Sequence, residues 1–123
     1  MCPNDCRVAA WVKPFAAFKA NVNPAYAWEP VIFRSARTAA DRAPIPEKGG
    51  PMTTTRDYLS CPITLKKGTV GAKPDAFCQW IFDLLGMRPD DEFVDLFPGS
   101  GAVSEAWERR QMSLDREIGR AIA

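Results

Sequence analysis

The sequence predicts one small α/β domain with a few-stranded sheet, flanking helices and a long loop rich in proline and glycine. Two apolar runs of strand length stand in the first third of the chain, at Arg7–Val12 and Trp28–Phe33. The last third instead places apolar residues at helical spacing, first between Pro74 and Leu85 and again after Ala102. Strand-length and helix-period patterns within one short chain are typical of mixed α/β domains.

The composition narrows the class of partner. A chain of 123 residues fits one domain with a modest core, and 46% hydrophobic with 25% charged residues is ordinary for a soluble globular protein. Sixteen basic and fifteen acidic residues leave a net charge of +1. That balance lacks the positive field that holds a nucleic-acid backbone, so we expect DNA binding to be weak at most. No apolar run predicts a membrane span or a signal peptide, so we expect no membrane partner and a cytoplasmic location.

Four scattered cysteines, and no histidine, limit the chemistry available to the chain. Cys2 and Cys6 could form an N-terminal zinc or redox pair, but the four thiols lack the paired spacing of structural zinc sites. Free, reduced thiols are the favoured interpretation, with Cys78 as a small buried thiol among aromatic residues. The lack of histidine removes the Ser–His and Cys–His forms of nucleophilic catalysis.

Two of the three predicted strands lie in the first third of the chain. Lys13-Pro14 should end the strand at Arg7–Val12, and a helical turn is expected over Phe15–Ala20. In the second strand, Trp28–Phe33, Pro30 lacks an N–H and so predicts an edge position or a bulge. The segment from 35 to 62 has few large apolar residues and predicts a long loop, with a short helix around Thr55–Leu59.

The C-terminal half has clearer boundaries. Pro74 stands at a helix start and Gly86 just past the helix end. A third strand is predicted at Glu92–Phe97, and a helix from Ala102 to Arg110. Whether that helix continues to Ala123 is left open. The apolar faces of the two helices are formed by Phe77, Ile81, Leu84 and Leu85, and by Val103, Ala106 and Trp107.

Between that strand and helix lies the most informative block, a glycine turn at Gly99–Gly101. Glycines let backbone N–H groups approach a ligand closely, because they carry no Cβ. The following helix adds unpaired N–H groups and the positive end of its dipole. A strand–glycine–helix corner therefore predicts a place for a polar, partly anionic cofactor.

The order of two blocks and the helix between them resembles a known family. The blocks are Gly71-x-Lys73-Pro74 and Asp95-Leu96-Phe97-Pro98-Gly99-Ser100-Gly101. They are similar to the C-terminal part of S-adenosylmethionine-dependent DNA amino-methyltransferases with permuted motif order, and the preceding strands look like those of phage-encoded members. The resemblance implies a partial Rossmann-like fold and S-adenosylmethionine as cofactor.

The resemblance also implies roles for single residues. Asp95 would lie near the amino group of the cofactor, and Phe97 and Pro98 would shape the wall. Gly99, Ser100 and Gly101 would wrap the methionine end. Lys73 and Pro74 would border the same pocket.

The catalytic motif of that family is Asp/Asn/Ser-Pro-Pro-aromatic, which holds the amine of a flipped base. Only Asn23–Tyr26 approaches it, and a loop is the favoured interpretation there, so we assign no catalytic residue. Asp115 and Glu117 stand near the distance expected for a ribose-binding acid, although solvated helix charges are favoured for both. Three lysines, Lys66, Lys67 and Lys73, could meet DNA phosphates but are more often solvated.

Two functions are favoured at this point, and a third, an active methyltransferase that completes its site by assembly with another chain, ranks last because the charge balance and the missing target-recognition sequence disfavour it. One is a truncated or degenerate DNA methyltransferase-like protein that keeps the cofactor-loop half and is not catalytic alone. The other is a small phage-type protein that binds a host protein, or self-associates, through its exposed sheet and aromatic surface, in the host-cell cytoplasm. In either case the expected organisation is an N-terminal strand pair (1–34), a loop-rich connection (35–70) and the cofactor-motif half (71–123).

Overall fold

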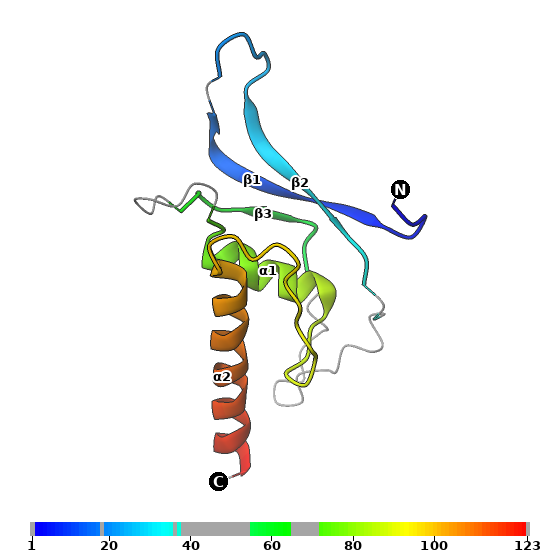
Figure 1. Cartoon of the computed structure of the whole chain (residues 1–123), viewed down its shortest axis with the longest axis vertical. Helices are drawn as coiled ribbons and strands as arrows, with labels where there is room; N and C mark the ends of the chain where they lie inside the picture. The colour runs from blue at the N-terminus through cyan, green and yellow to red at the C-terminus, as the bar shows by residue number, and fades with distance from the viewer. Residues whose placement is uncertain (1, 18, 36, 38–54, 65–71, 123) are drawn as a thin grey trace.

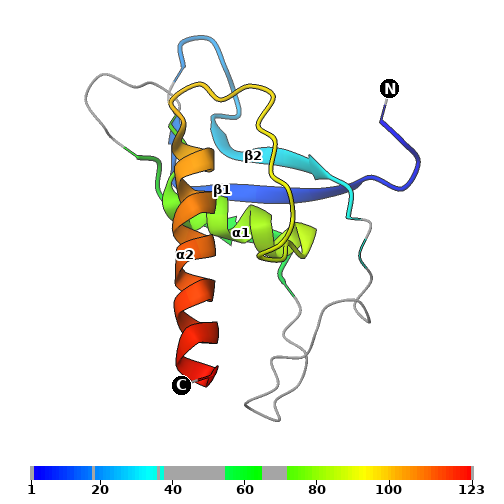
Figure 2. The same cartoon turned by 60° about the horizontal axis from the view of Figure 1, so that its bottom comes forward.

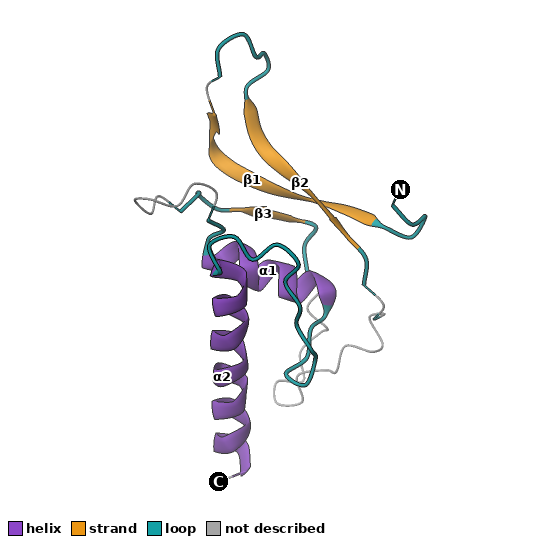
Figure 3. Cartoon of the chain, in the orientation of Figure 1, coloured by secondary structure: helices purple, strands orange, loops and turns teal. Residues whose placement is uncertain are grey.

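The mixed α/β class is confirmed by a computed structural model, which describes residues 2–17, 19–35, 37, 55–64 and 72–122. Within these ranges the chain forms a three-stranded sheet and two helices (Figure 3). In chain order the elements are β1 (Arg7–Ala17), β2 (Tyr26–Phe33), β3 (Tyr58–Ser60), α1 (Asp75–Leu85) and α2 (Ala102–Ile122). The predicted long loop and Gly71, Lys66 and Lys67 lie largely or wholly outside the described residues.

The sheet has the strand order β2-β1-β3. β1 and β2 are antiparallel, with Arg7 opposite Phe33 and Val12 opposite Trp28, whereas β3 runs parallel to β1. β2 therefore lies at an edge, as Pro30 predicted, because an edge strand can lack an N–H on its open side without losing a ladder bond.

Three local predictions in the first half are wrong. β1 does not end at Lys13-Pro14 but continues to Ala17, so residues 15–17 are extended where a helical turn was expected. An irregular register between Val12 and Ala17 accommodates the proline. The expected helix around Thr55–Leu59 is instead β3. Pairing with β1 supplies the ladder bonds, from Ala10 N to Asp57 O (2.9 Å) and from Cys61 N to Val12 O (3.1 Å).

The core lies between one face of the sheet and α1 (Figures 1 and 2). Trp11 is buried on that face, 4.8 Å from Phe77 between ring centroids, and its Nε1 donates to Cys61 O at 3.0 Å. In the described part of the chain, no helix covers the opposite face of the sheet, so the molecule has two layers. That uncovered face is called the outer face below.

Both helix predictions for the C-terminal part of the chain are confirmed, and α2 continues past the predicted end at Arg110 to Ile122. Pro74 is the N-cap of α1, and Gly86 ends it in the left-handed conformation (φ 63°), where a side chain would be strained. Ala106 and Trp107 are buried against α1, with Trp107 5.3 Å from Phe82 between ring centroids. Beyond these contacts α2 runs on as a single helix that stands clear of the sheet (Figure 1).

The predicted strand Glu92–Phe97 is wrong, and this is the main departure. The segment has no ladder partner among the described residues, although it keeps the alternating burial of a strand. Phe93 packs inward, 6.0 Å from Phe82 and 5.9 Å from Trp107 between ring centroids. Leu96 and Phe97 are 78% and 90% exposed. The apolar alternation specifies an extended chain, but a strand also needs a neighbour to accept its hydrogen bonds.

Candidate functional site

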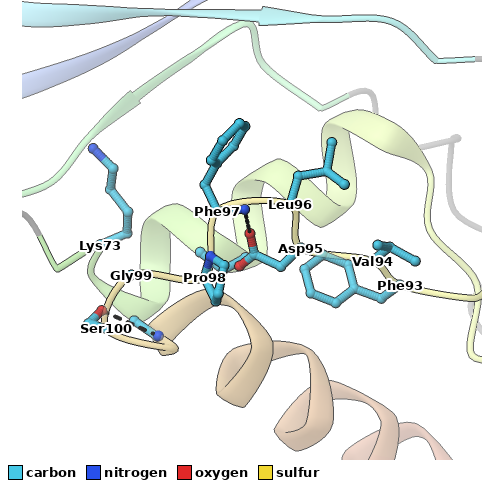
Figure 4. Close-up of a pocket in the computed structure, with 11 residues that line it drawn as sticks. Lys73, Phe93, Val94, Asp95, Leu96, Phe97, Pro98, Gly99 and Ser100 are labelled. Carbon is cyan, nitrogen blue, oxygen red and sulfur yellow. Dashed lines mark hydrogen bonds between the residues drawn. The ribbon is translucent and has the colours of Figure 1, made fainter.

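An open hollow of about 480 Å³ lies where the segment before α2 meets the start of that helix (Figure 4). Its walls come from the 93–100 segment, the first turn of α2 and Lys73, which stands two residues before α1. The lining residues are Lys73, Phe93, Val94, Asp95, Leu96, Phe97, Pro98, Gly99, Ser100, Ala102 and Val103.

Most of the predicted site residues come together in this hollow. Asp95, Phe97, Pro98, Gly99, Ser100 and Lys73 all line it. Two do not. Pro74 caps α1 from the next position along the chain, and Gly101 precedes α2 without forming part of the wall.

The turn needs its glycines. Gly99 and Gly101 both have positive φ, 51° and 77°, in the region that side chains rarely adopt. Gly101 N donates to Pro98 O at 2.7 Å, which closes the turn, and Gly101 O accepts the first hydrogen bond of α2 from Glu105 N at 3.0 Å. The turn therefore aims the start of a 21-residue helix at the hollow.

This corner presents backbone donors. Ala102 N donates to Ser100 Oγ at 3.4 Å. The N–H groups of Gly99, Ser100, Val103 and Ser104 have no acceptor anywhere in the described ranges. Unpaired N–H groups at a helix start, together with the helix dipole, favour an anionic group on a ligand.

Asp95 is the acidic group among the lining residues. Its Oδ1 accepts from Phe97 N at 3.0 Å, so one carboxylate oxygen shapes the turn (Figure 4). The side chain is half-buried beside the hollow. The second carboxylate oxygen leaves a negative charge at the wall that suits a cationic group on a ligand.

Lys73 contributes less than the resemblance implies. Its Nζ lies 3.3 Å from Glu29 Oε2 and 4.9 Å from the centroid of the Trp11 ring, so the ammonium points away from the glycine turn and toward the sheet (Figure 4). Lys13 also pairs with Glu29, and its hydrogen bond, with the charge of Lys73, lowers the pKa of that carboxyl. The aliphatic part of Lys73 therefore borders the hollow, while its ammonium pairs with Glu29 of β2.

The remaining candidates lie elsewhere. Asn23–Ala25 is a loop, as expected, and no residue of the Asn23–Tyr26 stretch lines the hollow. Asp115 and Glu117 are exposed on α2, which confirms them as solvated helix charges. Sequence reasoning missed the apolar lining by Phe93, Val94 and Leu96, although the alternating pattern of that segment placed it beside the turn.

Cysteine chemistry is absent from the hollow. Cys78 is buried in the core as expected, and burial raises the pKa of its thiol. No cluster of three or more His, Cys, Asp or Glu residues that could hold a metal occurs in the described ranges. Nor does any helix found there combine the length and apolar character needed to cross a bilayer.

Comparison with known proteins leaves the resemblance as a prediction. No protein-family model matches the chain, and no curated protein or solved structure is significantly similar to it.

Proposed function

We propose that the chain is a methyltransferase-derived domain that binds S-adenosylmethionine in the hollow beside the glycine turn and does not transfer a methyl group by itself. One observation carries this proposal: six of the eight residues expected to hold that cofactor line the same hollow. The family resemblance supplies the identity of the ligand, and the hollow supplies a place for it.

The chemistry of the wall suits the methionine end of this cofactor. That end carries a carboxylate and an ammonium group. The unpaired N–H groups of Gly99, Ser100 and the first turn of α2 offer donors to the carboxylate. Asp95 offers a negative charge to the ammonium. The exposed side chains of Leu96 and Phe97 give apolar surface on which the adenosine part can pack.

We expect no catalysis by the chain alone, because it lacks the group that would hold the methyl acceptor. Methyl transfer to a base amine requires the cofactor and an amine-holding group within reach of one another. The stretch closest to the family motif, Asn23–Tyr26, leads into β2 and contributes nothing to the hollow.

Isothermal titration calorimetry of the full chain tests the proposal, with S-adenosylmethionine and S-adenosylhomocysteine as ligands and adenosine as the control. We expect saturable heat with the first two and weaker binding of adenosine, which lacks the methionine end. No heat at millimolar S-adenosylmethionine would overturn the binding claim. Transfer of a tritiated methyl group to DNA by the chain alone would overturn the non-catalytic claim.

A second candidate function is supported by a different observation. The outer face carries apolar side chains that are about half exposed, including Trp28 and Tyr58. A patch of this kind on a sheet marks an interaction surface in many soluble proteins. We propose that the outer face binds another polypeptide chain, which is either a second copy or a different protein, such as a host protein if the gene is phage-borne.

A further inference from the structure

We infer that the outer face is a self-association surface, on which two copies of this chain stack their sheets about a two-fold axis. This inference rests on the second candidate function and names its partner. The surface is defined by six residues, called the outer patch: Val8, Ala10, Trp28, Pro30, Ile32 and Tyr58.

The register makes the outer patch continuous. Val8 pairs with Ile32 and Ala10 pairs with Pro30 across β1 and β2, and Ala10 also pairs with Tyr58 on β3. Paired residues point to the same face of a sheet. Side chains at the intervening positions, such as Trp11 and Leu59, pack into the core beneath. The patch therefore spans all three strands on the side that α1 and α2 leave uncovered (Figure 2).

The outer patch has the apolar area that a dimer needs. Its four large side chains, Val8, Trp28, Ile32 and Tyr58, are between 48% and 61% exposed. Taking about 200 Å² for each aromatic side chain and somewhat less for each aliphatic one, they expose on the order of 400 Å². A standard interface buries roughly 800 Å² on each partner, of which somewhat more than half is apolar. The exposed apolar area of the patch is therefore close to the apolar share of one side of such an interface.

The charges select the kind of partner. None of the six residues is charged, and the charged residues of the same strands turn away from the patch: Glu29 pairs with Lys13 and Lys73, and Arg7 lies 5.8 Å from the Phe33 ring centroid. Two identical patches can therefore meet without burying a charge of their own, while Arg56, whose Nη1 donates to Tyr58 Oη at 3.4 Å, is exposed at the rim. A single-stranded nucleic acid would stack on the aromatic rings but would also need a row of cations along its backbone, which the six patch residues with Arg56 at their rim do not supply.

The relief of the patch also suits a copy of itself. Ala10 and Pro30 form a low row between the bulkier Trp28 and Ile32 along β2. Sheets pack face to face about 10 Å apart by interdigitating large and small side chains. A two-fold axis that lies between the two sheets, midway between Trp28 and the low row, would place Trp28 of each copy over Ala10 and Pro30 of the partner, where a buried tryptophan contributes strongly to binding.

Sedimentation equilibrium of the full chain from micromolar to millimolar concentration tests this inference. We expect a reversible monomer–dimer equilibrium. Trp28→Lys and, independently, Ile32→Lys should each raise the dissociation constant by about tenfold or more, since each places a charge inside the interface. Ile122→Lys is the matched control, because it adds the same charge at an exposed apolar position near the end of α2, and it should leave the equilibrium unchanged.

Four outcomes would overturn the inference. The wild-type chain could stay monomeric at millimolar concentration, or the control could weaken the dimer as much as Trp28→Lys does. In the third, fluorescence anisotropy would detect binding of the monomer to a single-stranded oligothymidylate, with loss of binding in Trp28→Lys. Binding of a purified different protein by the monomer in a Trp28-dependent way would overturn the dimer yet retain the second candidate function. Calorimetry with S-adenosylmethionine on the same samples tests the first candidate function, cofactor binding, separately.

Discussion

Arg37 and Asp91 lie 54 residues apart in the chain and form a two-point ion pair, with Nη1–Oδ2 and Nη2–Oδ1 distances of 2.5 and 2.6 Å. Nη1 of the same guanidinium donates to Gly86 O at 2.9 Å, and Asp91 Oδ2 accepts from Arg88 N at 2.6 Å. The pair thereby fastens the turn that follows α1. That turn leads directly into the segment that lines the hollow, so the ion pair positions the candidate site from outside it.

The Arg37–Asp91 pair predicts an acid-sensitive contribution to stability. The hydrogen bond from Arg37 lowers the pKa of Asp91 from 3.8 to about 2. A carboxyl with a lowered folded-state pKa stabilises the fold fully above its unfolded-state pKa. We therefore expect this contribution to be present above about pH 4 and to be lost as the pH falls toward 2.

Asp91→Asn tests this prediction. It should lower the free energy of unfolding at neutral pH by about 1 kcal/mol, since the pair is partly exposed. The loss should shrink below pH 4, where the wild-type carboxyl is itself becoming protonated. Urea unfolding at several pH values measures both effects. Asp90→Asn, one residue earlier, is the control and should change neither. The prediction would be contradicted if the free energy of unfolding of Asp91→Asn fell between pH 4 and pH 2 as steeply as that of the wild-type chain.

Two glycines of similar surroundings should respond to alanine with opposite signs. At Gly101 the φ of 77° makes any side chain strained, so Gly101→Ala should destabilise the chain by about 1 kcal/mol. Gly119 lies inside α2, and a Cβ there would have nothing within 4 Å. Gly119→Ala should stabilise the chain by about 0.5–1 kcal/mol, because alanine loses less backbone entropy in a helix. Denaturant midpoints of the two variants decide the matter, and a shift of the same sign in both would refute it.

The aromatic cluster between the helices should carry much of the stability of the cofactor half. Trp107 is only 5% exposed and packs against Phe82 and Phe93. Trp107→Ala should therefore cost about 3–5 kcal/mol by leaving a cavity. Phe97→Ala removes an aromatic ring that is almost fully exposed, so it should change the free energy of unfolding by less than about 0.5 kcal/mol. Thermal unfolding followed by circular dichroism compares the two. Equal losses of stability in the two variants would contradict the burial of Trp107 and the exposure of Phe97 in the structure.

Asp95 allows its charge to be separated from its structural role. Asparagine at this position keeps a carbonyl oxygen that can accept from Phe97 N, so Asp95→Asn should preserve the turn and the free energy of unfolding. If the carboxylate also holds the ammonium of S-adenosylmethionine, affinity should fall by about tenfold. Calorimetry measures the affinity, and Asp90→Asn controls for the loss of a surface charge. Wild-type affinity in Asp95→Asn would remove this residue from the proposed binding site.

Much of the local structure could be predicted from short-range chemistry. Pro74 and Gly86 delimit α1 because one lacks an N–H and the other tolerates a left-handed conformation. Pro30 indicated an edge strand for the same kind of reason. The glycine turn could be predicted in the same way, since Gly99 and Gly101 adopt the positive φ that glycine permits. These are properties of single residues and their immediate neighbours, so they need no knowledge of the rest of the fold.

The errors arise where a segment depends on a distant partner. Tyr58–Ser60 is a strand because β1 lies beside it, and β1 continues to Ala17 because Ala17 pairs with Tyr26 at the start of β2, beyond an irregular register. The reverse holds for Glu92–Phe97, whose alternating pattern is that of a strand but which has no ladder partner in the part of the chain that the structure describes. Pairing is a relation between two segments, and the sequence of one segment does not specify it.

By itself, then, the sequence determined where the two C-terminal helices begin, which residues form the glycine turn, and that the chain is a small α/β domain. Only the tertiary structure decided that the hollow beside this turn gathers Asp95, Phe97 and Ser100 while the ammonium of Lys73 turns toward Glu29. It also decided that, among the described elements, both helices lie on the same side of the sheet. The reason is physical: caps and turns depend on the local backbone, whereas the direction of a long side chain and the covering of a face depend on what the folded chain brings near them.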